Sequence, residues 1–435
     1  SSQFGETRGR PPEATFLQRY SSRSSRVYIM TTRVVILGCG PSGQNAAKIL
    51  AKDKNLEVTV ITGCSFIEWP IAMSYVLARP DQHDKALAPN PKDFEVPGVN
   101  YTYSVVEKVD AKIKKVYLTG FKTVSYDMLI LATGFNIPLL YPRPGQTLKE
   151  RRAEVQDVGS RIKNAKSVAI GGGGPVGIEV AGDIKAAYPG MAVKLVVKDL
   201  LKQWPIDARQ DAEKQLAAMG IEVVKTKSDA PVEPRLSPGT IILDGKVVDY
   251  DVYLPMFSQG PNTKCLEEAD VLDGSGRLKV NAFLQSEVYP QIFAIGTGNT
   301  KDPWVGIPKL TAQWETVAAN ISARAADKPL KEHSEGEPGM VRQPVILIGH
   351  GANGYAIVDF SLFPAPLKVC CCNGYGGFPC CPPICCWPMV GPCACGYCCQ
   401  GPSGPGMAKM LESMQFEFGK RSFDGIGKPE QQLME

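Results

Sequence analysis

The sequence predicts an α/β fold: two Rossmann-like units with parallel sheets, followed by a small C-terminal α+β domain. An apolar strand, a glycine-rich turn and a helix follow one another at residues 33–51, and the same order recurs at 167–188. Two further apolar strands, at 126–131 and 291–295, also end in small residues. The chain has 435 residues, enough for two or three domains. Buried strands that alternate with helices are typical of parallel sheets.

The first unit begins with Val34–Leu37, an apolar run rich in β-branched residues, as a buried parallel strand requires. The next six residues spell G-x-G-x-x-G: Gly38, Cys39, Gly40, Pro41, Ser42 and Gly43. Gly38 permits the tight turn, Gly40 lets the backbone approach a pyrophosphate, and Gly43 lets helix and strand pack closely. The N-terminus of the following helix favours phosphate. This stretch therefore predicts a dinucleotide site.

The strand after this helix, Leu56–Ile61, is followed by a threonine. In a Rossmann-like unit an acidic residue usually stands here, about 20 residues past the glycines, and binds a ribose hydroxyl. Thr62 occupies the position instead. We expect a weaker contact with the nucleotide, because a threonine hydroxyl provides no charge assistance.

Short segments of alternating polarity follow a loop and helix at 66–78 and an irregular stretch at 81–97. The alternation predicts an antiparallel meander over Tyr101–Val109, Lys112–Thr119 and Thr123–Tyr126. The next strand ends in Ala132, Thr133 and Gly134. Small residues at this point let the backbone turn beside a bound cofactor.

The second unit follows a polar helix at 146–164 and begins with a strand at Ser167–Ile170. The helix after its turn carries Glu179. The turn again spells G-x-G-x-x-G, through Gly172, Gly173, Gly174, Pro175, Val176 and Gly177. A second dinucleotide site is therefore expected.

The following strand, Val193–Val197, ends in Lys198 and Asp199 rather than directly in an acid. A lysine here can accept the 2′-phosphate of NADPH, so the site is open to NADPH as well as NADH. The alternative is a solvated surface lysine, which the usual exposure of lysines favours.

Later elements continue the alternation of helices and strands. A helix is predicted at 211–219, and strands at Ile221–Val224, Thr240–Leu243 and Lys246–Tyr253, the last two joined by an Asp-Gly hairpin turn. The strand at 291–295 ends in Gly296 and Thr297. A helix is predicted over 311–326, with Thr311 as its N-cap.

Composition excludes some classes of function and leaves others open. The net charge is +4, and residues 1–30 hold five arginines against two glutamates, so the rest of the chain is close to neutral. This argues against a nucleic-acid partner. The N-terminal segment is rich in Ser and Arg, which fits a transit-like or disordered extension, or sequence upstream of a start at Met30. No apolar run is long enough to span a membrane.

The histidines and tryptophans indicate little chemistry. His83 and His333 lie in polar stretches, so we expect both to be solvated, and His350 lies in a predicted hairpin turn. Trp69 and Trp304 are expected in the core rather than in a cofactor pocket.

The two glycine units, the Ala-Thr-Gly turn between them and the late Ala-Ile-Gly strand form an ordered set. Over residues 31–330 this set resembles the flavoprotein superfamily with two dinucleotide-binding domains. The helix at 178–185, with Tyr188 and Pro189, is most similar to the apoptosis-inducing-factor-2-like branch, which includes ferroptosis-suppressor-type NAD(P)H:quinone oxidoreductases. Segments 345–360 and 406–423 resemble the C-terminal domain of that branch.

The resemblance implies FAD on the first glycine turn and NADH or NADPH on the second. It implies further FAD contacts at Thr62, the Ala-Thr-Gly turn, Gly296, Thr297 and a helix N-terminus at Thr311 and Ala312. Glu179 would position the nicotinamide and is the expected catalytic residue. Hydride would pass through the flavin to a quinone-like acceptor, since the flavin carries the redox chemistry.

Cysteine positions bear on the acceptor and on the cellular compartment. No C-x-x-C or C-x-x-x-x-C pair lies near either glycine turn, which argues against the thioredoxin-reductase and glutathione-reductase branches. A quinone or dioxygen that reaches the flavin directly fits better. Only Cys39, Cys64 and Cys265 lie outside the segment 370–399, so the body of the chain is expected to be intracellular and reduced.

The sequence also departs from the branch it resembles. Thr62 replaces an acid, and Gly296-Thr297 replaces the Gly-Asp whose carboxylate holds the ribityl chain. The arginine that the branch carries in the helix after Thr62 has no clear equivalent near Tyr75. Each lost charge-assisted bond costs about 1–3 kcal/mol. The alternative is therefore a catalytically weakened, flavoprotein-derived structural subunit of a membrane protein complex.

The cysteine-rich segment 369–408 contains no charged residue. It is interpreted first as a contact with a membrane surface, lipidated or not, or with a partner. Disorder and a metal or Fe–S site are the alternatives, the last because Cys395 and Cys398 have C-x-x-C spacing. We assign no metal ligand. The first interpretation suits a hydrophobic quinone at an intracellular membrane, in a mitochondrion or another organelle.

The expected organisation follows from these assignments. It comprises an extension at 1–30, an FAD-binding domain at 31–145 and 255–330, an NAD(P)H-binding domain at 146–254, and a C-terminal domain at 331–435 with the cysteine-rich insert.

Overall fold

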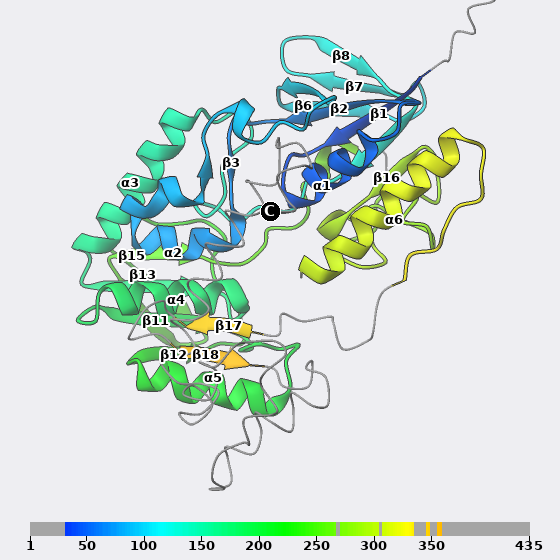
Figure 1. The fold of residues 1–435 in the computed structure, drawn as a ribbon. Helices are drawn as coiled ribbons and strands as arrows, with labels where there is room; N and C mark the ends of the chain where they lie inside the picture. The colour runs from blue at the N-terminus through cyan, green and yellow to red at the C-terminus, as the bar shows by residue number, and fades with distance from the viewer. Residues whose placement is uncertain (1–30, 267–269, 304–306, 335–344, 349–354, 359–435) are drawn as a thin grey trace, which may run out of the picture.

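The computed structural model describes residues 31–266, 270–303, 307–334, 345–348 and 355–358. Its first sheet holds five parallel strands in the order β16-β9-β1-β2-β5. The strands are β1 (Thr32–Leu37), β2 (Leu56–Thr62), β5 (Asn100–Tyr103), β9 (Met128–Leu131) and β16 (Ile292–Ala294). Helices α1 (Pro41–Leu50) and α6 (Ile307–Ala325) pack against each other beside this sheet (Figure 1).

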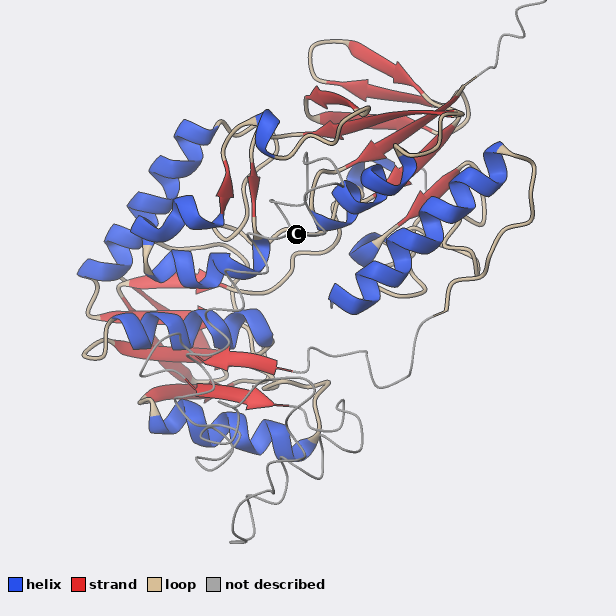
Figure 2. Cartoon of the chain, viewed as in Figure 1, coloured by secondary structure: helices blue, strands red, loops and turns tan. Residues whose placement is uncertain are grey.

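The second sheet repeats the parallel arrangement in the order β12-β11-β10-β15. Its strands are β10 (Ser167–Gly171), β11 (Ala192–Val197), β12 (Ile221–Lys225) and β15 (Val252–Pro255). Helix α4 (Pro175–Ala187) packs against β10 and β11, and α5 (Ile206–Ala218) packs against β12. Figure 2 shows the two sheets as separate groups of strands, each accompanied by helices. The predicted α/β fold is confirmed.

Antiparallel strands are confined to smaller sheets. The meander consists of β6 (Val106–Asp110), β7 (Lys115–Leu118) and β8 (Lys122–Ser125). The prediction that Tyr101 begins this meander was wrong, because Tyr101 pairs in parallel with Val60 of the first sheet. A run of alternating residues fits either arrangement, so pattern alone does not decide it.

The hairpin of β13 (Gly239–Leu243) and β14 (Lys246–Tyr250) turns at Asp244 and Gly245 as predicted, both with positive φ. The predicted strand Lys246–Tyr253 is divided in two. Its second part is β15, which leaves the hairpin and pairs in parallel with β10.

Several elements lie outside the two large sheets, most of them in the chain between β2 and β5, and one long helix between β9 and β10. They are β3 (Ile67–Glu68), η1 (Pro70–Ala72), α2 (Met73–Ala78), η2 (Pro80–Ala86), β4 (Leu87–Ala88), η3 (Pro91–Asp93) and α3 (Leu148–Asn164). Helix α2 packs against α3 and α4, and its apolar side chains share the core of the second sheet. Trp69 belongs to the same core, as predicted for that residue.

Two helices begin earlier than predicted. Helix α5 begins at Ile206, directly after Pro205, and α6 begins at Ile307 with Pro308 in its first turn. Proline fits the first turn because its missing N–H has no intrahelical partner there. Thr311 is therefore not an N-cap, and Thr311 and Ala312 lie in the second turn of α6.

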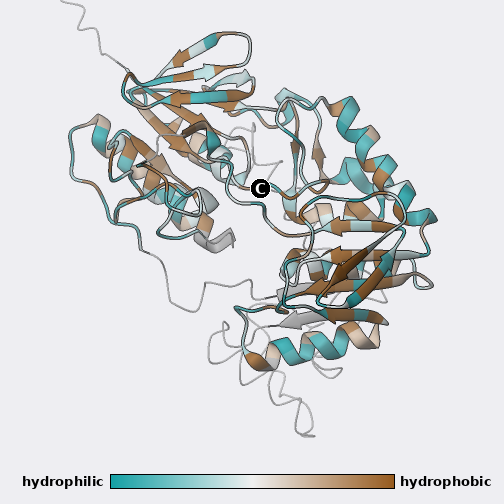
Figure 3. Cartoon of the chain, turned by 180° about the vertical axis from the view of Figure 1, so that it is seen from behind, coloured by the Kyte–Doolittle hydropathy of each residue, from teal (hydrophilic) through white to brown (hydrophobic). Residues whose placement is uncertain are grey.

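The apolar side chains form one large core around each sheet. In Figure 3 brown gathers on the strands of the two large sheets, while several outer helices are largely teal, as this burial requires. The remaining short elements are η4 (Lys264–Leu266), η5 (Gly296–Gly298), and the antiparallel pair β17 (Val345–Ile348) and β18 (Tyr355–Val358), which confirms the predicted hairpin.

Within the described ranges, no helix combines the length and hydropathy needed to cross a bilayer. The predictions for residues 1–30, Trp304, His350, segment 406–423 and the cysteine-rich segment fall outside the described residues.

Candidate cofactor site

The first glycine turn is dictated by close contacts between backbones. Gly38 has φ +105°, and a Cβ there would lie 2.4 Å from the carbonyl oxygen of Ala132. A Cβ on Gly43 would lie 2.0 Å from the carbonyl oxygen of Gly38. Both positions therefore require glycine for the fold itself. The contact also places the Ala132–Gly134 turn beside the glycine turn.

Gly40 differs from these two glycines, because a Cβ there would meet nothing within 4 Å. It caps α1, whose first intrahelical hydrogen bond runs from the Gln44 N–H to the Gly40 carbonyl at 3.0 Å. The amides of Ser42 and Gly43 come before that bond and so have no partner within the helix. The open side of the turn therefore offers N–H groups and the positive end of a helix to an anion.

Gly296 and Thr297 approach the same turn from the other side. Gly296 has φ +75°, and a Cβ there would lie 4.0 Å from Ser42 Oγ and 3.4 Å from Leu310 of α6. Three segments far apart in sequence, 38–43, 132–134 and 296–297, thus meet at the carboxyl ends of β1, β9 and β16. Ligands of open α/β sheets bind at this kind of edge.

Two hydroxyls at this edge test whether a polar cofactor fits. Thr133 Oγ1 and Thr297 Oγ1 are both buried, and neither has a hydrogen-bond partner among the described residues. Buried hydroxyls are nearly always satisfied in folded proteins. A dinucleotide with hydroxyl, phosphate and ring polar atoms would supply the missing partners, so these residues fit FAD.

A buried polar network that the sequence did not predict holds Gly296. Gln313 Oε1 accepts from the Gly296 N–H at 2.6 Å, and Asn299 Nδ2 donates to the Gly296 carbonyl at 2.7 Å. His333 Nε2 lies 3.4 Å from Asp302 Oδ2, and both side chains are buried. The prediction that His333 is solvated was wrong. His333 lies 31 positions from Asp302 in a polar segment, which gives no sign of this pairing. Asn299 and Gln313, near or in an apolar helix, were the available signal.

Thr62 lies at the end of β2, where its Oγ1 donates to the Cys64 carbonyl at 3.4 Å. The Ser104 N–H donates to the Thr62 carbonyl at 2.9 Å. The hydroxyl thus stays within its own loop, and the structure provides no charged group at this position.

The second glycine turn has the same geometry as the first. Gly172 has φ +118°, and its Cβ would lie 2.8 Å from the Met256 carbonyl oxygen; a Cβ on Gly177 would lie 2.1 Å from the Gly172 carbonyl oxygen. Gly174 faces open space and caps α4, which begins at Pro175 and Val176. The first intrahelical bond again joins residues four apart, Ile178 and Gly174. The turn offers the same anion site.

Glu179 lies buried in the second turn of α4. Burial raises the pKa of Tyr141, and the charge of Glu179 raises that pKa further, which places the two side chains in one neighbourhood. Tyr141 also forms an edge-to-face contact with Phe135, with ring centroids 5.6 Å apart. The segment that leaves the Ala132–Gly134 turn therefore leads from the first site to Glu179 at the second.

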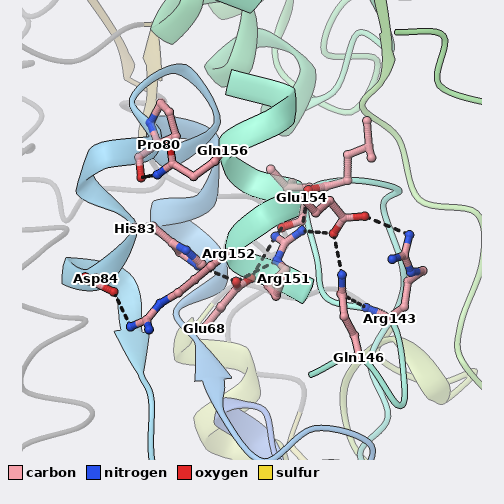
Figure 4. Close-up of polar contacts among 12 residues, drawn as sticks. Glu68, Pro80, His83, Asp84, Arg143, Gln146, Arg151, Arg152, Glu154 and Gln156 are labelled. Carbon is pink, nitrogen blue, oxygen red and sulfur yellow. Dashed lines mark hydrogen bonds and ion pairs between the residues drawn. The ribbon is translucent and has the colours of Figure 1, made fainter. Parts of the chain in front are cut away.

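Arg151 fixes this connecting segment. Its guanidinium is fully buried and donates to the Leu139 carbonyl at 3.0 Å and the Leu140 carbonyl at 2.9 Å. It also donates to Glu68 at 2.8 and 3.0 Å, and His83 Nε2 lies 2.6 Å from the same carboxylate (Figure 4). His83 is therefore buried, and the prediction that it is solvated was wrong.

The described cysteines provide no redox pair. Cys39, Cys64 and Cys265 form no disulfide among the described residues. Burial raises the pKa of the Cys39 thiol well above its usual range and that of Cys64 to about 11. Thiols with raised pKa values are poor nucleophiles at neutral pH. The described part of the chain also contains no group of metal-ligating side chains.

The comparison with known protein families agrees with two glycine turns of the same geometry on two parallel sheets. The family model for pyridine nucleotide-disulphide oxidoreductases matches residues 32–313. The chain belongs to this family. Members of the family use FAD and a pyridine nucleotide, so the chain is a pyridine nucleotide-dependent flavin oxidoreductase by class.

Individual relatives are distant. An FAD-dependent oxidoreductase of Flammulina velutipes is 28% identical over 289 residues, which cover 63% of this chain and 86% of that protein. Ferroptosis suppressor protein 1 of Mus musculus is 27% identical over 263 residues, 54% of this chain and 67% of that protein. The sulfide:quinone oxidoreductase structure from Aquifex aeolicus shares the fold, with TM-score 0.55, 17% identity, and coverage of 69% of this chain and 78% of that one.

Proposed function

We propose that the protein is an FAD-dependent oxidoreductase that takes hydride from NADH or NADPH and delivers it to a quinone-like acceptor. The observation that carries the proposal is the pair of glycine turns, each with a tight backbone contact and one open glycine. FAD is assigned to the turn at Gly38–Gly43 and the nicotinamide coenzyme to the turn at Gly172–Gly177. When bound, the flavin supplies the hydride-transfer chemistry.

The chain's own part is binding and orientation. The N-termini of α1 and α4 attract the two pyrophosphates. Thr133 and Thr297 provide hydroxyls that lack partners among the described residues. Glu179 lies near Tyr141 at the end of the segment that leaves the first site, where it would orient the nicotinamide. The buried network at Gly296 fixes the backbone at the edge of the FAD site.

The absence of a reactive thiol pair among the described residues supports an acceptor that reaches the flavin directly. The relative named ferroptosis suppressor protein 1 supports the apoptosis-inducing-factor-2-like branch within the family. The uncharged cysteine-rich segment supports seating on an intracellular membrane or a membrane protein complex. Together these points favour a hydrophobic quinone over a protein disulfide.

The absorption spectrum of the natively purified protein tests this proposal. We expect oxidised-flavin bands, loss of the long-wavelength band on anaerobic addition of NADH or NADPH, and its return on addition of a short-chain quinone. A band that bleaches but does not return with any quinone would support a flavoenzyme that oxidises the nicotinamide coenzyme. It would contradict a quinone as the acceptor. A protein that stays colourless after FAD is added would contradict the proposal that this chain is a flavoenzyme.

A second candidate rests on Thr62 and Thr297. Neither end of the FAD site carries the carboxylate that the resemblance implies, and the Thr62 hydroxyl is used within its own loop. The alternative is therefore a weakened, flavoprotein-derived subunit of a membrane complex. It predicts a colourless protein that migrates with a larger membrane assembly in native gels and separates from it when segment 369–408 is deleted.

A further inference from the structure

We infer that the second dinucleotide site selects a 2′-phosphorylated coenzyme, NADPH rather than NADH, and that Lys198 is the residue that selects it. The inference rests on the proposed function, because it concerns the same nucleotide site. The inference is based on the geometry at the end of β11, where Lys198 follows the strand beside the glycine turn.

The end of β11 lies against the glycine turn of α4. Gly171 of β10 pairs with Val196, which sets the two strand ends level. A Cβ on Gly173 would lie 2.2 Å from the Asp199 carbonyl oxygen, and the Leu201 N–H donates to the Gly173 carbonyl at 2.7 Å. Gly173 is thus glycine because the loop 199–201 folds back onto it. The residue between the strand and this loop is Lys198.

A Rossmann-like unit recognises the ribose next to adenine from the end of this strand. Val197 occupies that position, since it follows the pair Gly171–Val196 as Thr62 follows the pair Leu37–Ile61, and Lys198 is the next residue. A carboxylate here accepts from the 2′-hydroxyl of NADH, whereas a nearby cation accommodates the 2′-phosphate of NADPH. Lys198 supplies a cation. The neighbouring carboxylate, Asp199, lies 3.7 Å from Lys202 Nζ on its own loop.

Lys198 is held in place by an exchangeable partner. Its Nζ lies 2.9 Å from Asp229 Oδ1, and these side chains are 45% and 85% exposed. Exposed ion pairs of this kind contribute little to stability. A phosphate monoester carries nearly two negative charges at neutral pH against one on a carboxylate. The 2′-phosphate can therefore displace Asp229 at small cost and gain a charge-assisted bond.

The loop that carries Asp229 is itself fixed. The Thr226 N–H donates to the Val197 carbonyl at 2.8 Å, and Ser228 donates to Asp244 through its N–H at 3.1 Å and its hydroxyl at 2.7 Å. These bonds keep Asp229 near the strand end in the free protein. Asp229 thus orients Lys198 until the coenzyme arrives.

Calorimetric titration of the full chain with adenosine phosphates tests the inference without flavin turnover. The ligands are adenosine 2′,5′-bisphosphate, its 3′,5′ isomer as a control of equal charge, and adenosine 5′-monophosphate. We expect the 2′,5′ isomer to bind about tenfold more tightly than either control, the gain expected of one charge-assisted bond. Lys198→Ala should remove this preference, and Asp229→Asn should strengthen binding of the 2′,5′ isomer alone.

Lys194→Ala removes a lysine within β11, whose Nζ donates to the Asp249 carbonyl at 3.4 Å; it is the matched control and should leave all three affinities unchanged. Equal binding of the 2′,5′ and 3′,5′ isomers, or a preference that survives Lys198→Ala, would overturn the inference and leave the nucleotide site in place. If none of the three nucleotides binds, the proposed function itself fails at its second site.

Discussion

Arg151 and Glu68 form a two-point ion pair between residues 83 positions apart, and neither side chain is accessible to solvent. Glu68 belongs to β3, in the chain between β2 and β5, and Arg151 to α3, the helix before β10, so the pair joins an excursion of the first unit to the start of the second. Since Arg151 also binds the carbonyls of Leu139 and Leu140, one side chain fixes the segment that connects the two sites.

Loss of this guanidinium should strongly destabilise the protein. Arg151→Ala would leave Glu68 buried without its main cation, and breaking a buried pair in this way costs about 3–5 kcal/mol. Arg152→Ala is the matched control, because the Arg152–Asp84 pair is exposed and is expected to contribute about 0–1 kcal/mol. Urea unfolding measures both values. Similar losses for the two variants would show that the buried pair does not stabilise the fold.

The same pair predicts a pH dependence of stability. Burial raises the pKa of Glu68, but hydrogen bonds from His83 and Arg151 outweigh it and hold the pKa below its ordinary value. The folded state thus binds this proton less tightly than the unfolded chain. The stability is fully present above the unfolded pKa, about 4.3, and is lost as the pH falls through the folded pKa.

Unfolding free energies measured from pH 6 downward should therefore fall more steeply for the native chain than for Glu68→Gln. Asp84→Asn, which removes an exposed carboxylate, should run parallel to the native chain. Parallel curves for Glu68→Gln and the native chain would contradict the assignment.

Alanine substitutions in the first glycine turn should separate folding from cofactor binding. Gly43→Ala places a Cβ 2.0 Å from a backbone oxygen, so we expect it to lose several kcal/mol of stability. Gly40→Ala meets no protein atom, and the Gly40 backbone lies at φ −73°, which alanine adopts freely. It should fold normally and bind FAD more weakly, because its methyl group occupies the phosphate side. Circular dichroism and flavin absorbance give the two readouts.

The unpartnered threonine hydroxyls allow a second separation of the same kind. Thr133→Val and Thr297→Val remove hydroxyls that lack partners among the described residues, so the flavin-free protein should be no less stable than the native chain. Their affinity for FAD should fall by about tenfold for each lost hydrogen bond to the cofactor. Thr226→Val is the control, since its hydroxyl donates to the Ser228 carbonyl at 3.0 Å, and it should cost about 1 kcal/mol without affecting FAD. Unchanged FAD affinity would place these hydroxyls outside the site.

The features that the sequence predicted well are local ones. Both glycine turns, the hairpin at Asp244 and the strands beside them follow from contiguous residues, so a short window contains the whole signal. The start of α6 was misplaced because Thr311 has the residue type of an N-cap, whereas Pro308 already fits a first helical turn.

The buried polar groups were missed because their partners are distant in sequence. His83 reads as a loop residue until β3 brings Glu68 to 2.6 Å from it. His333 is likewise defined by Asp302, 31 positions earlier. A charged or polar stretch usually indicates solvent-exposed side chains. Only the tertiary structure shows which of these side chains are buried and paired.

The six motif glycines do not all indicate coenzyme use. Gly38, Gly43, Gly172 and Gly177 are fixed by backbone contacts within the protein, and Gly40 and Gly174 face open space. A descendant that abandoned both coenzymes would still need the first four to fold, and selection would relax at the other two. The complete motif therefore indicates descent from a nucleotide-binding protein. Only the two open glycines, Gly40 and Gly174, indicate whether nucleotides still bind.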